Sequence, residues 1–186
     1  MEEHAYPLQL YYNTQIVLLH KKLIFVFEMR KLILVVSMYF VKLFDIRIDA
    51  DLIQEEVAKI LGVTQENYSR WETGKEFIPL NKLNILCNYF HVSMDYALGL
   101  DENKTYKEVS LDKNIIGKRL REFRHNIGIT QKELAKILNT TQSTISAYEK
   151  GHTLILASFA YQLGKKYNLS LDWLVSRSNT MFISKK

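Results

Sequence analysis

The sequence contains very little cysteine, proline or glycine. Its single cysteine, Cys87, excludes an intrachain disulfide and fits the reducing conditions of the cytosol. Two prolines and seven glycines among 186 residues favour helices over a loop-rich or all-β chain. Of the three apolar runs near the N-terminus, 16–19, 23–27 and 32–41, the longest has ten residues, about half of the roughly 20 that a membrane-spanning helix needs. We therefore expect an all-α, cytoplasmic protein and no membrane contact.

The residue patterns of enzymes and cofactor sites are also missing. The five histidines show no ligand spacing, and one cysteine cannot form a zinc cluster. No glycine-rich loop that would hold a phosphate is present. No stretch combines a nucleophile with a base or pairs two carboxylates in a plausible local setting. We therefore expect no catalytic activity, no metal and no cofactor.

The most informative feature of the chain is an internal repeat. Residues 54–100 align without a gap to residues 131–177, and 15 of the 47 positions are identical. Chance would give only about 3 matches for ordinary residue usage. The identical pairs are Gln54/Gln131, Glu56/Glu133, Ala58/Ala135, Lys59/Lys136, Ile60/Ile137, Leu61/Leu138, Thr64/Thr141, Gln65/Gln142, Ser69/Ser146, Glu72/Glu149, Gly74/Gly151, Ile78/Ile155, Leu86/Leu163, Ser93/Ser170 and Asp95/Asp172. Two copies predict a tandem pair of small domains, not a solenoid.

The repeat divides the chain into domains. We expect a first domain at 38–100, a polar linker at 101–113, a second domain at 114–178 and a short frayed tail at 179–186. Residues 1–37 lie outside the repeat and lack the cleavage site of a signal peptide. The repeat register places Ile115 on Met38, so we hypothesise that Met38 is the natural start and that 1–37 is an over-extended reading frame. The alternative is an N-terminal extension that packs on the first domain or on a partner.

The two copies differ in net charge. Residues 38–100 carry 6 basic and 9 acidic groups, a net charge of −3, whereas residues 101–186 carry 15 basic and 8 acidic groups, a net charge of +7. A basic domain indicates a polyanionic partner. The two copies are therefore not expected to contribute equally.

Hydrophobic periodicity and capping residues predict five helices in each copy. In the first copy they lie along Phe40–Ile48, at 53–61, 65–72 and 80–90, and from Ser93 onwards; in the second they lie at 115–127, 131–138, 142–149, 156–167 and 171–175. Asp51 is predicted to form a turn and to be a candidate N-cap. The other predicted caps are Gly62, Thr64, Pro79, Thr130 with Glu133 as a capping box, and Thr141. Cys87 and the aromatic residues Trp71, Tyr89, Tyr96, Tyr148 and Trp173 have helical spacing and are expected in the core.

Each copy contains a short helix, a tight turn and a second short helix, which is the helix-turn-helix arrangement. The apolar pairs Val57/Leu134, Leu61/Leu138, Tyr68/Ile145 and Trp71/Tyr148 would hold the two helices on a core. The remaining positions of the second helix are mostly amides, hydroxyls and arginine, which can hydrogen-bond base edges in the major groove. Residues 130–151 and 53–74 resemble the Xre/phage-repressor family of helix-turn-helix domains, and residues 92–99 and 169–175 resemble the closing fifth helix of that family.

This resemblance covers about residues 38–178 and implies two tandem five-helix domains that bind double-stranded DNA. It implies that Gln54 and Gln131 contact phosphate and brace the recognition helices, 65–73 and 142–150. It further implies that Gln65/Gln142 reach base edges and that Glu66/Ser143 and Arg70/Ala147 occupy further reading positions. Asn67/Thr144 would contact phosphate or base, and Lys75/His152 would lie near the phosphate backbone. Thr64 and Thr141, which precede the recognition helices, complete the predicted set together with Arg119. Three departures are Ala147, which offers only an apolar contact, Leu156 in place of Pro79, and Glu66, which repels phosphate.

The basic residues Lys118, Arg119, Arg121 and Arg124 on the first helix of the second copy are predicted to contact phosphate, which supplies most non-specific affinity. The second copy should therefore bind DNA more strongly, and either both copies or the second alone contact DNA. We expect a transcriptional regulator, more readily a repressor than an activator. Two domains on one chain would act as a pseudo-dimer on half-sites about 34 Å apart, and a homodimer of chains is equally compatible. The alternatives are an antitoxin or adaptor whose first domain binds a protein partner, and a membrane-tethered regulator that uses residues 1–37.

Overall fold

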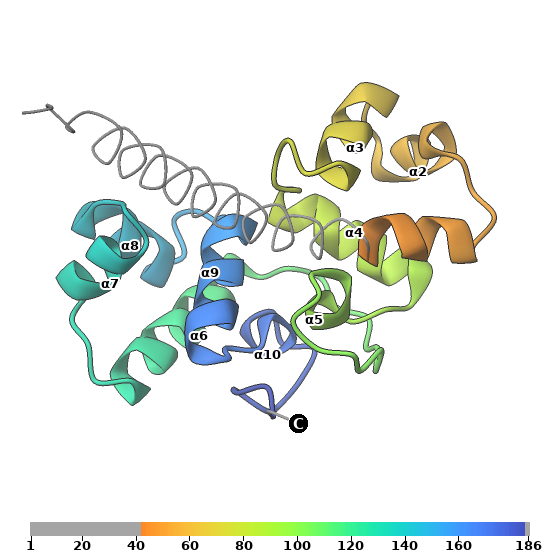
Figure 1. Cartoon of the computed structure of the whole chain (residues 1–186). Coiled ribbons are helices and arrows are strands. Elements are labelled where there is room, and N and C mark those ends of the chain that lie inside the picture. The colour runs from red at the N-terminus through yellow and green to blue at the C-terminus, as the bar shows by residue number, and fades with distance from the viewer. Residues whose placement is uncertain (1–41, 185–186) are drawn as a thin grey trace, which may run out of the picture. The chain divides into compact units, whose positions relative to one another are not determined.

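The computed structural model describes residues 42–184, which form helices joined by turns and by one longer segment between the two copies (Figure 1). The first copy has a helical segment at 42–49, followed by α2 (Gln54–Leu61), α3 (Gln65–Glu72), α4 (Leu80–Phe90) and α5 (Met94–Ala97). The second copy has α6 (Lys113–Asn126), α7 (Gln131–Ile137), α8 (Gln142–Glu149), α9 (Ala157–Tyr167) and α10 (Leu171–Leu174). The described residues contain no strand beyond an isolated antiparallel bridge between Leu169 and Phe182. The predicted all-α class and tandem arrangement are confirmed, whereas both hypotheses about residues 1–37 concern a segment outside the described residues.

Side-chain caps define most of the helix ends that the sequence predicted. The hydroxyls of Thr64 and Thr141 accept hydrogen bonds from the backbone amides at the third position of α3 and α8. Thr130 and Glu133 form the predicted capping box at the start of α7, and Gly62 ends α2 in the left-handed conformation, with φ of 63°. Asp51 lies in the predicted turn before α2, with φ of 54°, but it is not the N-cap, because Ile53 takes that position.

The core of each copy consists of the apolar pairs that the repeat predicted. All eight members of the pairs Val57/Leu134, Leu61/Leu138, Tyr68/Ile145 and Trp71/Tyr148 are buried. Cys87 is a buried free thiol, and burial raises its pKa well above the ordinary value. Tyr89 is the exception among the predicted core aromatics, because its side chain is half exposed and packs edge-on against Phe90.

The described residues of both copies belong to one compact unit. The segment between α5 and α6 is held in place: the backbone oxygen of Val109 accepts hydrogen bonds from the amides of Asn84 and Asn88, at 3.0 and 3.2 Å. The predicted frayed tail is wrong as far as residue 183, because Ile183 donates its backbone amide to the carbonyl of Asn168 at 2.8 Å. In the described part of the chain no helix combines the length and the apolar character that a membrane span requires.

Candidate nucleic-acid interface

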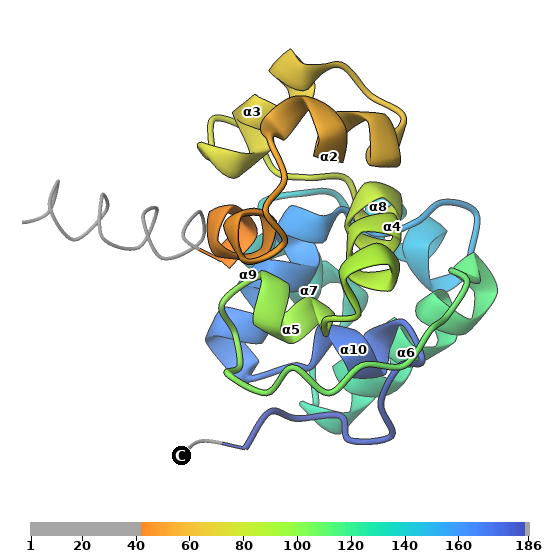
Figure 2. The same ribbon diagram turned by 90° about the vertical axis from the view of Figure 1, so that its right-hand side faces the viewer.

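The helix-turn-helix motif of each copy is a pair of contacting helices, α2 with α3 and α7 with α8 (Figure 1, Figure 2). The second helix of each pair is short and ends in a buried glutamate, Glu72 in α3 and Glu149 in α8. A carboxylate without partners would be costly at such a position. The groups that surround it therefore determine how the recognition helix is held.

A buried ion pair anchors each recognition helix to the first helix of its own copy. Arg47 donates to both carboxylate oxygens of Glu72 at 2.7 and 2.8 Å, and Arg124 donates to both oxygens of Glu149 at 2.6 and 3.0 Å. Each guanidinium also donates to a backbone carbonyl five residues further on, at 2.9 Å in the first copy and 3.0 Å in the second. Such two-pronged geometry is among the strongest hydrogen bonding that proteins use.

The glutamine that opens each motif completes this network. The side-chain amide of Gln54 donates to Glu72 at 3.0 Å, and that of Gln131 donates to Glu149 at 2.8 Å. Burial opposes ionisation of both carboxyls, but the hydrogen bonds from arginine and glutamine outweigh it and lower the pKa of each carboxyl. Both glutamates are therefore held ionised, and each glutamine joins the start of α2 or α7 to the end of the recognition helix.

Sequence reasoning missed these two arginines as a pair. Arg47 and Arg124 are separated by the same 77 positions as the rest of the repeat, so extending the alignment backwards would have found them. Arg124 was predicted to contact phosphate as part of a basic helix face. That prediction is wrong, because the side chain is 9% exposed and bound to Glu149.

In the first copy a shallow groove of about 480 Å³ brings together five of the residues predicted to contact DNA. Its lining comprises Gln54, Gln65, Glu66, Ser69, Arg70, Thr73 and Lys75. The amide, carboxylate, guanidinium and ammonium groups there come from the start of α2, the exposed face of α3 and the loop after it. Asn67 is exposed but is not among the lining residues, and Thr64 uses its hydroxyl to cap α3.

Within this groove Arg70 already has an acidic partner. Its guanidinium forms an ion pair of 2.6 Å with Glu76, in the loop after α3, and both side chains are about half exposed. Glu76 also donates its backbone amide to the carbonyl of Arg70 at 3.2 Å. The equivalent positions in the second copy are Ala147 and Thr153, so neither member of the pair is repeated.

The second recognition helix presents mostly uncharged polar groups, with Lys150 exposed at its end. Gln142, Ser143 and His152 are exposed, whereas Thr144 and Ala147 are half-buried. The hydroxyl of Thr141 lies 2.8 Å from that of Ser143 and 2.9 Å from that of Thr144. This side of α8 therefore offers one long amide and a cluster of hydroxyls.

Arg119 has partners within its own copy. Its guanidinium donates to the backbone carbonyls of Trp173 and Ser178 and lies over the Trp173 ring, 5.1 Å from the ring centre. The repeat gives the first copy the same contact, because Lys42 lies 4.6 Å from the centre of the Tyr96 ring. These contacts connect the first helix of each copy to its short fifth helix.

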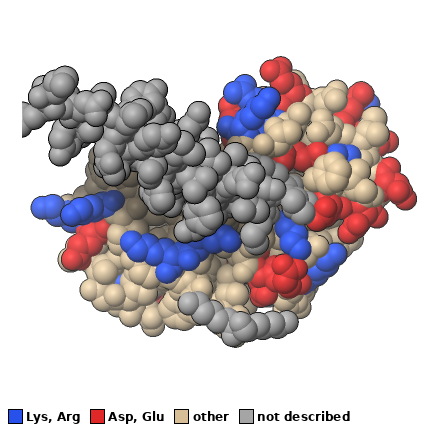
Figure 3. Space-filling model, in the orientation of Figure 1, with Lys and Arg blue, Asp and Glu red and all other residues tan. Residues whose placement is uncertain are grey.

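The charged side chains of the described residues are unevenly distributed. Acidic groups gather on the right side of the face drawn in Figure 3, where Figure 1 places α2 and α3. On α6, Lys118 and Arg121 remain exposed after Arg119 and Arg124 have found partners. The basic side chains available to a polyanion on this helix are thus fewer than the sequence predicted.

Two contacting helices with an exposed polar second helix, twice in one chain, define a helix-turn-helix protein. Residues 117–179 match a family model described as a helix-turn-helix domain, and residues 43–96 match another described as helix-turn-helix. The chain is 33% identical over 86 residues to YobD of Bacillus subtilis, an uncharacterized HTH-type transcriptional regulator, covering 46% of this chain and 70% of the relative.

Two further relatives are similar over shorter stretches. The HTH-type transcriptional regulator ImmR of Bacillus subtilis is 37% identical over 71 residues, which cover 38% of this chain and 54% of the relative. An uncharacterized HTH-type transcriptional regulator of Archaeoglobus fulgidus is 37% identical over 54 residues, 29% of this chain and 77% of the relative. No solved structure matches. The chain belongs to the family of HTH-type transcriptional regulators, with two such domains in tandem, and is a DNA-binding transcriptional regulator.

Proposed function

We propose that this regulator inserts both recognition helices, residues 65–73 and 142–150, into the major groove and represses transcription by occupying a promoter. The observation that carries the proposal is the groove along α3, where an arginine, a glutamine and a lysine face solvent side by side. Arginine bonds guanine and glutamine bonds adenine in the major groove, and lysine neutralises phosphate. The cytoplasm is the proposed location, because DNA is the ligand.

In the first domain Gln65 and Arg70 read bases, Glu66 restricts the choice of base, and Lys75 contacts phosphate. Gln54, held by Glu72 at 3.0 Å, presents the rest of its amide to the backbone. Asn67 and the backbone around Thr64 flank this contact at the start of α3.

In the second domain Gln142 reads a base, and Ser143 and Thr144 add hydroxyl contacts to bases or phosphate. Ala147 offers an apolar contact to a thymine methyl group. Gln131, Thr141 and His152 occupy the places of Gln54, Thr64 and Lys75. Arg119 supports the domain through Trp173 and is not assigned a DNA contact.

The competing function is an antitoxin or adaptor in which the second domain binds DNA and the first binds a protein. It is not favoured, because the first domain carries the larger set of exposed reading groups and the similar proteins are named as transcriptional regulators. A homodimer of chains remains compatible with DNA reading by both domains.

The test is selection of bound duplexes from a random library by the full chain at a stated salt concentration, followed by binding measurements on the Arg70→Ala and Gln142→Ala variants. Each substitution should weaken binding by about 5- to 150-fold, the equivalent of the 1–3 kcal/mol of a good base contact. Each should also relax selection within its own half-site only. If Arg70→Ala leaves binding unchanged while Gln142→Ala abolishes it, the first domain is not a reader; enrichment of no sequence would overturn the proposal.

A further inference from the structure

The short fifth helices of the two copies, α5 and α10, bind each other's N-terminal ends. The carboxylate of Asp172 accepts hydrogen bonds from the backbone amides of Met94 and Asp95, both at 2.9 Å. In return the carboxylate of Asp95 accepts the backbone amide of Leu171 at 2.7 Å and the hydroxyl of Ser170 at 2.6 Å. We call this set of four hydrogen bonds the α5–α10 clasp.

The clasp has the reciprocity of a two-fold dimer interface, in which residue i contacts residue j and residue j contacts residue i. Asp95 and Asp172 are equivalent positions of the repeat, and each is only 5% exposed. The chain therefore joins its two copies through the same element of each, as two separate subunits would. Because both halves of this interface lie on one chain, no second chain is needed to form it.

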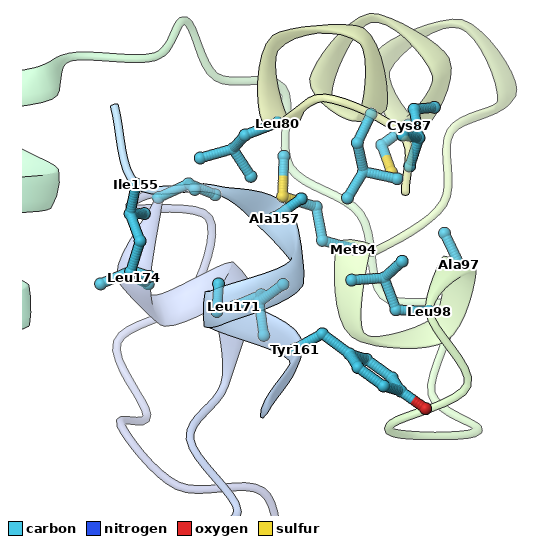
Figure 4. Packing of buried hydrophobic residues seen from close by; sticks show 14 of the residues in the cluster. Leu80, Cys87, Met94, Ala97, Leu98, Ile155, Ala157, Tyr161, Leu171 and Leu174 are labelled. Atoms are coloured by element: carbon cyan, nitrogen blue, oxygen red, sulfur yellow. The ribbon is translucent and has the colours of Figure 1, made fainter. Parts of the chain in front are cut away.

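Apolar packing surrounds the clasp. Figure 4 shows Met94 of the first copy beside Ala157 of the second, with Leu171 nearby, and all three are buried. A separate contact lies on α9. A β-carbon added to Gly164 would lie 2.7 Å from a methyl carbon of Leu100, so glycine allows the end of the first copy to pack directly on this helix.

A buried arginine from the second copy reaches the first. Arg177 donates to the side-chain oxygen of Asn84 at 2.8 Å and to that of Asn88. It also donates to the backbone carbonyl of Lys107 at 2.6 Å, in the segment that joins the copies. Its side chain is 2% exposed. Separating the copies would break these hydrogen bonds between the second copy and the first.

The two readers, the recognition helices α3 and α8, present different side chains to DNA. Both begin with glutamine, but the following reading positions pair Glu66 with Ser143 and Arg70 with Ala147. An arginine prefers guanine, whereas an alanine contacts the methyl group of thymine. Two identical half-sites would therefore leave one reader mismatched.

We propose that the α5–α10 clasp makes a single chain a pre-assembled pair of readers, whose ligand is one asymmetric duplex with two unlike half-sites at a fixed spacing. This inference rests on the proposed reading of DNA by both domains. The clasp takes the place of chain dimerisation, and the polar segment between the copies does not act as a free tether. The half-sites share the base pair read by glutamine and differ where residues 70 and 147 read.

The experiment uses the full chain and a library of duplexes in which the two selected half-sites are separated by every spacing across one helical turn. Native mass spectrometry gives the number of chains per duplex. We expect one chain per duplex, and at least tenfold weaker binding when one half-site is moved by about 5 base pairs, to the opposite face of the duplex. Two chains on a palindrome, or equal binding at every spacing, would overturn the inference.

Variants connect the spacing dependence to the clasp. Asp172→Asn loses one of the two carboxylate oxygens that accept backbone amides, and it should reduce the spacing dependence several-fold while single half-sites still bind. Asp112→Asn is the matched control, because this carboxylate caps α6 within its own copy, accepting a backbone amide at 2.8 Å. Its spacing dependence should equal that of the wild type.

If Asp172→Asn fails to fold, the variant Leu100→Asn, which weakens the packing on Gly164, is used in its place in the same assay. An unchanged spacing dependence in a folded clasp variant would overturn the role of the clasp. If the wild-type chain bound no half-site at all, the proposed reading of DNA would be overturned instead. The two failures are therefore distinguishable.

Discussion

Glu149→Ala is expected to destabilise the second domain through the charge that it leaves behind. Arg124 would lose both oxygens that it binds at 2.6 and 3.0 Å while its side chain stays 9% exposed. It would keep the carbonyl of Ile129 at 3.0 Å and the ring nitrogen of His125 at 3.4 Å, and neither of these carries a negative charge. Breaking a buried pair from one side costs about 3–5 kcal/mol, a large part of the 5–15 kcal/mol that ordinarily separates folded from unfolded states.

The measurement is the free energy of unfolding from urea titration, with the midpoint of thermal unfolding as a second readout. For a unit of this size about 2–4 °C corresponds to each kcal/mol, so the midpoint should fall by roughly 10 °C. The double variant Arg124→Met, Glu149→Met removes both charges and keeps apolar volume in place, and it should recover most of the loss. The corresponding pair Arg47 and Glu72 provides an internal comparison in the first domain.

Two results would refute this reasoning. A loss below about 1 kcal/mol for Glu149→Ala would mean that the pair behaves like an exposed one. A double variant less stable than the single one would mean that the pair contributes net stability and that the uncompensated charge is not the main cost. The pH dependence offers a further check: because the pKa of Glu149 is lowered in the folded state, its contribution is present above the unfolded pKa and is lost as the pH falls through the folded one.

Three further predictions concern separate features. Glu76→Gln should free Arg70 from its 2.6 Å ion pair, so that binding to the selected duplex strengthens several-fold at low salt in a fluorescence titration; unchanged affinity would mean that the pair does not compete with DNA. Thr130→Ala removes the N-cap of α7 and should cost about 1 kcal/mol in urea unfolding, and a cost near zero would show that Glu133 alone suffices. Burial, together with Asp172, raises the pKa of Asp95 from 3.8 to about 8, so the folded state holds a proton that the unfolded state releases above its ordinary pKa, and stability should fall as the pH rises from about 4 to about 8. Asp95→Asn should flatten that part of the thermal-unfolding profile, and an equally steep fall in this variant would assign the effect to another group.

Several elements of this protein followed from sequence because they depend on neighbours in the chain. The spacing of apolar residues and Pro79 placed α4 at residues 80–90, as the structure has it. Hydroxyl residues before polar helices identified the caps at Thr64, Thr130 and Thr141. Helix periodicity and capping are local, since they act over three or four residues.

The prediction of function came from the internal repeat. Two aligned copies of a helix-turn-helix pattern predicted the tandem domains and their family before any coordinates. The polar face of each recognition helix could also be read from sequence, because the apolar stripe leaves only one face for it. Which of those residues contact DNA stays a prediction.

Only the tertiary structure decided which charged side chains have their partners inside the protein. Arg124 belongs to a helix whose basic residues looked alike in sequence, yet it pairs with Glu149, 25 positions away, and Arg119 binds Trp173, 54 positions away. Asp95 and Asp172 are separated by 77 residues, and each binds the backbone of the other copy. A residue's spacing along a helix determines which face it lies on, but the partner on that face depends on how distant segments pack. For that reason the sequence by itself determined two helix-turn-helix domains, whereas only the tertiary structure decided that the two are joined by reciprocal hydrogen bonds into one compact unit.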